Sequence, residues 1–362
     1  MNNKKLTILG LIAAFMLVWA VMQAKIAGRP ASPRISSASL IQGLNPDKVR
    51  QIEIKAADLS LELRRAGNIF VVPDKDNFPA RSDRINELFT QLLDIRMTEL
   101  ITNNPANHKE LQVTEENASH VIKFLDEKNE LITGIILGNR TEQGGQYARL
   151  AGANEVYLVL DVPWIRTSPL DYIEQNLLQL NTENIASVTV TDSGGFSYTL
   201  KSDPNSGEVS LSVPIPAGKQ LSPEHKNVFS ALRSFRLEDV MRDSSVPEEL
   251  VFDKTYICNL KDSSIYIIKL AESQNGDTFV QCSAVFSDKQ DVVIDITRQE
   301  SDEELRKKEA KLLALEAVER FNRRCKGWTF KIPSWIANNL TKPLDELLED
   351  IKEPDNAEEI ED

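Results

Sequence analysis

The sequence predicts an α+β protein with an N-terminal transmembrane helix, two repeated strand–helix–strand units with mainly antiparallel sheets, and a C-terminal helix. Three observations lead to this class: a charge-free apolar run at the start, alternating strand patterns around amphipathic helix patterns, and a strand–helix order that occurs twice. We expect six segments: a cytoplasmic tail and anchor over 1–27, a linker over 28–43, a first α+β repeat over 44–179, a second over 180–299, a C-terminal helix and closing strand over 300–344, and an acidic tail over 345–362.

The apolar run extends from Leu6 to Met22 and follows two lysines. As a helix it would be about 26 Å long, close to the thickness of a hydrocarbon core. A cleaved signal peptide is the alternative, but neither available cleavage site has the small residues that cleavage needs. Basic residues flank the run on both sides, so its orientation rests on the short N-terminal tail. We expect a single-pass anchor in a bacterial inner membrane, with the C-terminal part in the periplasm.

The charge of the chain disfavours nucleic acid as a partner. The net charge is −13, and residues 1–34 contain five basic and no acidic residues, so residues 35–362 carry −18. Half of this negative charge lies in the tail 345–362, which has ten acidic residues and one lysine. Such a block is typical of a solvated, frayed tail, and a docking peptide for a basic surface is the alternative.

The repeat is visible in the strand and helix patterns. LNPDKVRQIEIK begins at Leu44 and LNTENIASVTVT begins at Leu180, and each predicts a short turn followed by an alternating strand. The helix patterns over 82–102 and 222–242 align without a gap, and each begins with a serine where an N-cap belongs. The matching order and register favour duplication over two unrelated α+β segments.

The remaining patterns complete the two units and the C-terminal part. Strand pairs are predicted over 119–138 and 145–160 in the first unit, and over 255–271 and 277–286 in the second. Residues 300–328 predict a long helix, 328–336 a closing strand and loop, and 340–351 a last helix. The apolar face of the long helix is expected at Ala310, Leu313, Ala317, Phe321 and Cys325.

One glycine motif invites a functional interpretation. In GNRTEQGGQYARL, Gly144 and Gly145 are not followed by a helix N-terminus or a lysine, so a hairpin turn is favoured over a phosphate cradle. Tyr147 and Arg149 alternate along the next strand and therefore share one face. They form either a structural pair or a contact patch.

The cysteines and histidines give no metal or catalytic motif. Cys258 and Cys282 fall in two predicted strands of one unit, and they either pair as a disulfide after export or are two small buried residues. The histidines His108, His120 and His225 stand among polar neighbours and are expected at the surface. We expect no cofactor, no metal site and no enzyme.

Three segments carry a resemblance to a known family. NIFVVP, FPARSDRINELFTQLLDIRMTELI and LITGIILGNRTEQGGQYARLAGANEVYLV resemble a bacterial family classified as a domain of unknown function, over residues 44–180. Members of that family have an N-terminal membrane anchor and a large exported α+β part. Their genes often stand beside those of gliding-motility-type ABC transporters. The resemblance implies an accessory subunit of an ABC transport system and supplies no catalytic residues.

Three functional hypotheses follow, in order of preference. The first is a non-enzymatic accessory protein, with the inner membrane as a partner through Leu6–Met22 and with ABC transporter membrane subunits as protein partners. The second is a periplasmic ligand-binding protein with its site between the two repeats, because clefts between domains are favoured ligand sites. The third is an enzyme that acts on envelope polymers.

Overall fold

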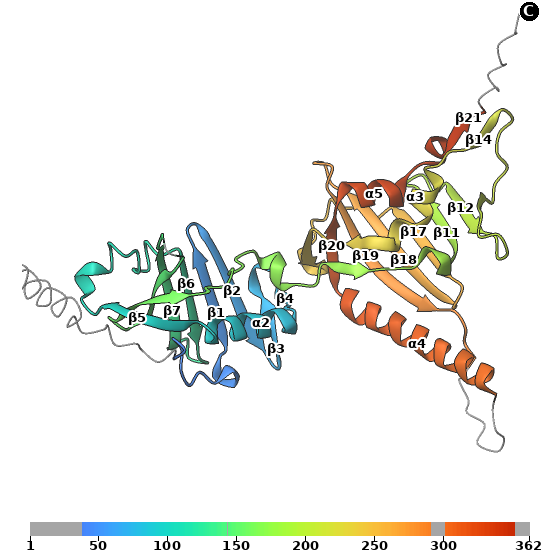
Figure 1. Cartoon of the computed structure of the whole chain (residues 1–362). Coiled ribbons are helices and arrows are strands. Elements are labelled where there is room, and N and C mark those ends of the chain that lie inside the picture. Colours follow the sequence, from blue (N-terminus) through green and yellow to red (C-terminus); the bar gives the residue numbers. More distant parts are fainter. Residues whose placement is uncertain (1–37, 143, 291–300, 352–362) are drawn as a thin grey trace, which may run out of the picture. The chain divides into compact units, whose positions relative to one another are not determined.

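The computed structural model describes residues 38–142, 144–290 and 301–351, and it forms two compact units (Figure 1). Unit 1 comprises the chain up to Phe70 together with Ser82–Ser168, and unit 2 comprises Val71–Arg81 together with Pro169–Asp362. Unit 2 therefore consists of two separate stretches of the chain, whereas each predicted repeat is one continuous stretch. Within the described ranges, no helix is long and apolar enough to span a membrane, and the predicted anchor Leu6–Met22 lies outside them.

The strands of unit 1 belong to a nine-stranded sheet with the order β4-β3-β2-β1-β6-β7-β8-β9-β5, in which β4 and the end of β3 come from the segment Val71–Arg81 that is assigned to unit 2. The strands are β1 Gln51–Ala56, β2 Leu59–Ala66, β3 Ile69–Val72, β4 Phe78–Pro79, β5 Arg96–Thr102, β6 His120–Leu125, β7 Leu131–Arg140, β8 Gln146–Leu150 and β9 Val156–Leu160. The α-helix α2 Ser82–Leu93 follows β4, and the short 3₁₀ helices of unit 1 are η1 Pro46–Lys48 and η3 Pro105–Asn107, while η2 Pro73–Lys75 lies in the segment assigned to unit 2.

The two faces of this sheet are covered by different segments. On one face the ring of Phe89 in α2 stacks on the ring of Phe124 in β6, with 5.3 Å between centroids. On the other face the connection between β5 and β6 covers part of the sheet, because Val113 packs in one buried cluster with Val121 and Ile136. Burial of aliphatic and aromatic side chains on both faces stabilises the unit.

Unit 2 is built on an eight-stranded sheet with the order β13-β12-β11-β17-β18-β19-β20-β16. These strands are β11 Ile185–Thr191, β12 Ser197–Ser202, β13 Val209–Leu211, β16 Asp239–Arg242, β17 Lys254–Leu260, β18 Ser264–Glu272, β19 Thr278–Phe286 and β20 Trp328–Ile332. Two small pairs add β10 Asn176–Leu178 with β15 Phe235–Arg236, and β14 Lys219–Leu221 with β21 Leu348–Asp350. The 3₁₀ helices are η4 Pro169–Tyr172, η5 Thr182–Asn184, η6 Ala231–Ser234, η7 Asp243–Ser245 and η8 Leu344–Leu347.

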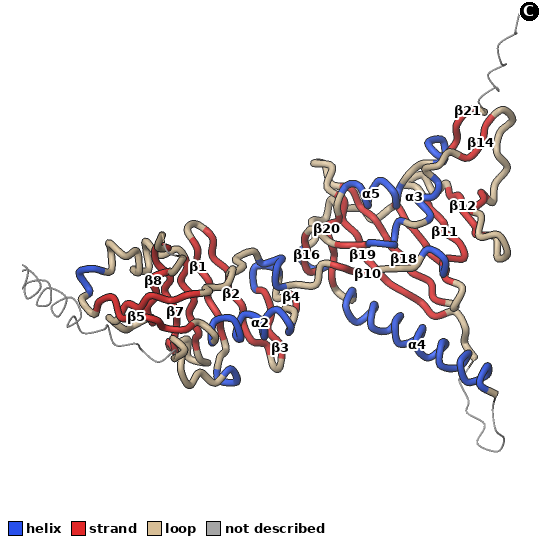
Figure 2. Tube along the Cα trace, viewed as in Figure 1, coloured by secondary structure: helices blue, strands red, loops and turns tan. Residues whose placement is uncertain are grey.

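Three helices pack on one face of the sheet of unit 2 (Figures 1 and 2). They are α3 His225–Phe229, α4 Asp302–Cys325 and α5 Ser334–Thr341. The hydroxyl of Tyr256 in β17 donates to the Val228 carbonyl of α3 at 2.8 Å, and the ring of Tyr266 in β18 meets the ring of Phe321 in α4 edge-on at 5.1 Å. Side chains alternate between faces along a strand, so these contacts identify the covered face.

The two sheets share one strand order. Reading from β3 to β5 in unit 1 and from β13 to β16 in unit 2, each sheet begins with three strands in reversed chain order. It then has four strands in chain order and ends with β5 in unit 1 and β16 in unit 2, each of which lies between the first helix of its unit and those four strands in the sequence. Ile52 of β1 pairs with Phe124, and Val188 of β11, 136 residues later, pairs with Cys258. This agreement of order and register supports duplication of one fold.

The closing strand β20 takes the place in unit 2 that β9 takes in unit 1. It therefore belongs to the second sheet and not to a separate C-terminal segment. The long helix α4 stands between β19 and β20, where unit 1 has only a turn between β8 and β9. The second repeat thus continues past its expected end at residue 299 and contains the helix.

Both repeated helices are shorter than predicted. The pattern over 82–102 forms α2 only to Leu93, and Arg96–Thr102 is strand β5. The pattern over 222–242 forms α3, η6 and then strands β15 and β16. The β-branched residues Thr98, Ile101 and Thr102 favour the extended conformation, and pairing of β5 with β9 outweighs the helical periodicity.

The helix over 302–325 is confirmed, and its predicted buried face is correct at Phe321 and Cys325 but wrong at Ala310, Leu313 and Ala317. Leu313 is 59% exposed, whereas the buried residues are Ala314, Val318, Phe321 and Cys325. These lie in the second half of α4, where small side chains allow close packing on β18 and β19. Ala314 and Val318 form the contact in place of the predicted Leu313 and Ala317.

The ends of the described chain also differ from the predictions. The segment 340–351 does not form the single helix that was predicted. It forms the 3₁₀ helix η8, in which Leu347 is buried, and strand β21, which pairs with β14. The first part of the predicted acidic tail is therefore an ordered strand, while residues 352–362 lie outside the described ranges. The end of the predicted linker is ordered too, since Leu40 is buried and its backbone N–H donates to the Ile95 carbonyl at 2.7 Å.

Candidate functional site

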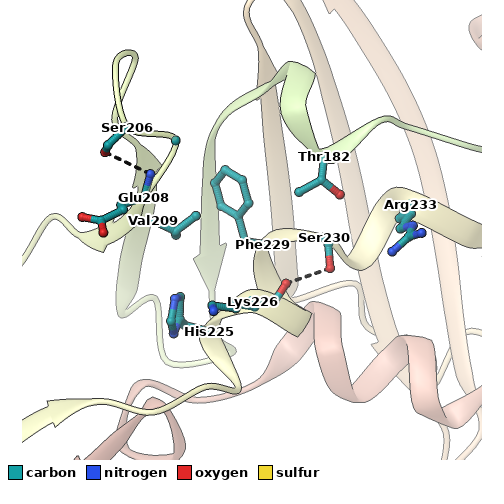
Figure 3. A pocket seen from close by; sticks show the side chains of 10 residues that line it. Thr182, Ser206, Glu208, Val209, His225, Lys226, Phe229, Ser230 and Arg233 are labelled. Atoms are coloured by element: carbon teal, nitrogen blue, oxygen red, sulfur yellow. Dashed lines mark hydrogen bonds between the residues drawn. The ribbon is translucent and has the colours of Figure 1, made fainter.

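A pocket of about 710 Å³ lies within unit 2, between α3 and the turn that joins β12 to β13 (Figure 3). Its floor is the ring of Phe229, which is buried, and its rim is polar. The lining residues are Thr182, Ser206, Gly207, Glu208, Val209, His225, Lys226, Phe229, Ser230 and Arg233. The pocket combines an apolar floor with polar groups around its rim, a composition that small-molecule sites often have.

Hydrogen bonds to the surrounding backbone hold the wall formed by α3. The His225 ring is hydrogen-bonded through Nδ1 to the Ser222 carbonyl, and Ser230 Oγ donates to the Lys226 carbonyl at 2.7 Å (Figure 3). Tyr256 donates to the Val228 carbonyl from the sheet below, and burial raises the pKa of Tyr256 well above its usual value. These bonds fix a five-residue helix that would be marginal by itself.

The opposite wall is a turn organised by Asp203. Its carboxylate accepts from the backbone N–H groups of Asn205 and Ser206, each at 2.8 Å, and these bonds lower the pKa of Asp203. Gly207 has a φ of +72°, a conformation that favours glycine. Asp203 therefore serves the shape of the turn, and Glu208 is the carboxylate that the pocket lining presents.

The charges at the rim favour an anion. Lys226 and Arg233 line the pocket, and among the residues that the structure describes neither has an ion-pair partner. The nearby carboxylate of Glu224 is already engaged by Lys342 at 3.3 Å and by Asn227 at 3.1 Å. Two unpaired cations beside hydroxyl groups can bind a carboxylate or a phosphate group through charge-assisted hydrogen bonds.

A second candidate is the face of the unit 2 sheet opposite its helices. On this face Ile257 pairs with Ile267 across β17 and β18, and Ile265 pairs with Val285 across β18 and β19. The three isoleucines are partly exposed and Val285 is 50% exposed. We call these four residues the open face. They form an aliphatic patch, and patches of this kind on soluble domains are typical of protein interaction sites.

The glycine motif has the predicted structural role. Gly144 has a φ of +89°, and the Gly145 carbonyl accepts from the Thr141 backbone N–H at 2.7 Å, which closes the β7–β8 hairpin turn. Tyr147 packs against the cluster around Val113. Arg149 donates through Nε to the Val113 carbonyl at 2.6 Å. These contacts favour the structural pair over the contact patch.

The proposed pairing of Cys258 with Cys282 is wrong. Cys258 lies opposite Tyr266 on one side of β18, while Cys282 lies opposite Ile268 on the other side. A strand between two cysteines separates them by two strand spacings, roughly 10 Å, which exceeds the reach of a disulfide. All three cysteines are thiols in the structure, and Cys258 and Cys325 are buried.

Two histidines differ from the surface prediction. His108 is 7% exposed, and its Nε2 is hydrogen-bonded to the Asn154 carbonyl at 2.9 Å. His120 is half-buried, and its pKa is lowered by burial first and then by Arg140. His225 lines the pocket, and its polar neighbours in the sequence belong to the rim of that pocket.

Sequence reasoning did not single out Lys226 and Arg233. A spacing of seven residues within one helix pattern would place them on a shared side, but α3 ends at Phe229 and Arg233 lies in η6, so the sequence carries no direct signal for their arrangement. In the described ranges, no group of three or more His, Cys, Asp or Glu side chains is arranged to hold a metal ion.

Comparison with known proteins gives a family but no characterised relative. The model of the family described as Domain of unknown function (DUF4340) matches residues 71–255, which is just over half of the chain. The comparison finds no match among curated proteins or among solved structures. The match begins within β3, where the chain enters unit 2, and it ends at the start of β17. The chain therefore belongs to the DUF4340 family.

Proposed function

We propose that this protein is a non-enzymatic accessory protein, held at the inner membrane by Leu6–Met22, whose periplasmic body binds the membrane subunits of an ABC transporter. The observation that carries the proposal is the open face of unit 2. Its four aliphatic side chains stand in a sheet whose other face already has a helical cover. Such a patch gains free energy when a partner removes it from water.

The surroundings of the open face favour a protein partner over a lipid surface. Uncharged Thr255, Asn259 and Ser283 lie beside the aliphatic residues on the same strands. The part of the chain after residue 34 carries −18, which opposes contact with an anionic bilayer. The exposed Lys269 follows Ile267 on the same face, so the aliphatic centre has a polar rim that includes a cation, a composition found at protein–protein interfaces.

The test is site-specific photo-crosslinking of the full-length protein in its own membranes. A benzophenone amino acid at position 267 should form an adduct that mass spectrometry identifies as an ABC transporter membrane subunit. The matched control carries the same probe at Leu59, which is a 60% exposed apolar residue of unit 1, and should form no such adduct. Recovery of no transporter subunit at position 267 in intact membranes would count against the proposal.

The pocket of unit 2 supports a second candidate, a periplasmic protein that binds a small anion. The unpaired Lys226 and Arg233 are the observation that favours it. Thermal-shift measurements on the full-length protein with phosphate, citrate and a sugar phosphate would test it. Binding should raise the unfolding midpoint and should be lost in Lys226→Ala and Arg233→Ala. Lys201→Ala, at an exposed lysine of β12, is the control, and a flat response to all three anions would remove this candidate.

A further inference from the structure

The second half of α4 is fixed to β19 by a set of specific contacts. The Asn322 side chain donates to the Ala284 carbonyl and accepts from the Ala284 backbone N–H, both at 2.8 Å. One residue earlier, Phe321 packs edge-on against Tyr266, which lies opposite Ala284 in the sheet. These contacts set the register between the helix and the strand.

That register brings two cysteines together. Cys325 is the last residue of α4, three positions after Asn322, and Cys282 lies two positions before Ala284 on the helix-covered face of β19. The pocket that Cys282 lines also includes Asn322 and Lys326, which stand on either side of Cys325 in the sequence. Burial raises the pKa of the Cys282 thiol, and the neighbouring Cys325 raises it further.

A molecule in solution can reach this pair through the sulfur of Cys282. Cys325 is 2% exposed, whereas Cys282 lines a pocket of about 440 Å³ on the surface of unit 2. Arg323 and Lys326 also line this pocket. An incoming disulfide can therefore reach Cys282 and not Cys325.

We propose that Cys282 and Cys325 are a site of disulfide formation, by exchange with a disulfide donor in an oxidising compartment, and that the bond ties the end of α4 to the sheet. The Cys282 thiolate attacks one sulfur of the donor, forms a mixed disulfide and releases the donor's other sulfur as a thiol. The Cys325 thiolate then attacks Cys282 in the mixed disulfide and displaces the second donor thiol. Two protein thiols are oxidised and one donor disulfide is reduced to two thiols.

The third cysteine is an internal control for this reaction. Cys258 is fully buried and β18 separates it from Cys282. Burial raises the pKa of Cys258 to about 12, and it also raises that of Cys282, so the two thiols differ in access and in having a neighbouring thiol rather than in acidity. It should remain a thiol under conditions that oxidise the other two.

The experiment is thiol counting on the purified full-length protein after incubation with oxidised glutathione. Alkylation in denaturant should modify one cysteine before reduction and all three after it, and peptide mapping should show Cys282 linked to Cys325. Cys258→Ser should form the same link and leave no free thiol. The proposal is overturned if all three thiols persist, if a link includes Cys258, or if glutathione stays bound to Cys282 with no internal link.

A stability measurement gives an independent readout. Oxidation should raise the thermal midpoint of unit 2 by about 5–10 °C in the wild type and in Cys258→Ser. The same treatment should leave the midpoint of Cys282→Ser unchanged. An equal shift in Cys282→Ser would contradict an internal bond, because that variant has no partner for Cys325. This inference goes beyond the proposed function and does not depend on the identity of any partner.

Discussion

The sheets of units 1 and 2 have the same strand order. On the sheet face opposite the α-helices, however, positions that are polar in one unit are apolar in the other. The register that aligns Ile52 with Val188 also aligns the pair Lys123 and Gly134 of unit 1 with the pair Ile257 and Ile267 of unit 2. Further from the hairpin turn, the buried Val121 and Ile136 of unit 1 align with Thr255 and Lys269. Each unit is therefore apolar where the other is polar.

The connections that follow β5 and β16 explain part of this difference. In unit 1, residues 103–119 place Val113 over Val121 and Ile136, and Glu115 pairs with Lys123 at 2.6 Å. In unit 2 the equivalent connection, residues 243–253, is shorter. The apolar residues of unit 1 lie under its connection, whereas those of unit 2 remain partly exposed. A duplicated fold thus covers its apolar residues in one copy and leaves them partly exposed in the other.

The largest expected effect is a loss of stability in unit 1, from a substitution that displaces the connection covering one face of its sheet. A Cβ at Gly138 would lie 2.2 Å from the Leu111 carbonyl oxygen and 2.6 Å from Val113 Cγ1. Gly138→Ala should therefore displace the connection and destabilise unit 1 by about 2–3 kcal/mol. Hydrogen exchange of β6 and β7 in urea measures this loss. Gly145→Ala, whose Cβ would meet the flexible Leu158 side chain, should cost less, and equal losses would contradict the argument.

The next effect tests how unit 2 secures its own covered face. Tyr256 is the counterpart of Ile122, and its hydroxyl donates to the Val228 carbonyl. The isoleucine of unit 1 has no hydroxyl and makes no such bond. Tyr256→Phe should destabilise unit 2 by about 1–2 kcal/mol, because the Val228 carbonyl loses its buried donor. Urea unfolding measures the change. Tyr157→Phe, at a partly exposed tyrosine of unit 1, is the control and should have little effect.

An exchange of polarity tests the comparison directly. Ile257→Lys gives unit 2 the residue type of its counterpart Lys123. Because Ile257 is only partly buried, the stability change should stay below about 1 kcal/mol. Crosslinking from position 267 to the membrane partner should nevertheless be lost. Unchanged crosslinking in this variant would show that the open face is not the contact surface.

The smallest effect is a pH dependence confined to unit 1. The pKa of His120 is lowered by its burial, so the unfolded chain binds a proton more readily than the folded one. The stability of unit 1 should be constant above pH 6.5, the usual value, and should fall as the pH drops through the lowered pKa. Urea midpoints across pH 5–8 measure it, and His120→Gln should flatten the curve. The equivalent position in unit 2 is Lys254, so its curve should lack this slope.

Repeated patterns at fixed offsets allowed the duplication to be predicted from the sequence. The offset of 136 residues identified Ile52 and Val188, which the sheets place at equivalent positions. Helix ends could not be predicted, because Arg96–Thr102 has both helical and strand periodicity and only pairing with β9 decides between them. The pocket and the open face depend on which sheet face the helices cover, and such long-range packing leaves little trace in one sequence.

The early segment Val71–Arg81 has a consequence for the order in which the protein is made. Phe78 packs edge-on against Trp328 at 4.8 Å, and the Asp76 carboxylate accepts from the Arg242 backbone N–H at 2.8 Å. A ribosome that synthesises the chain releases Phe78 long before Trp328 exists, so this part of unit 2 can close only after synthesis is nearly complete. A fragment that starts at Pro169 would lack these partners, and an expressible unit 2 needs both pieces of its chain.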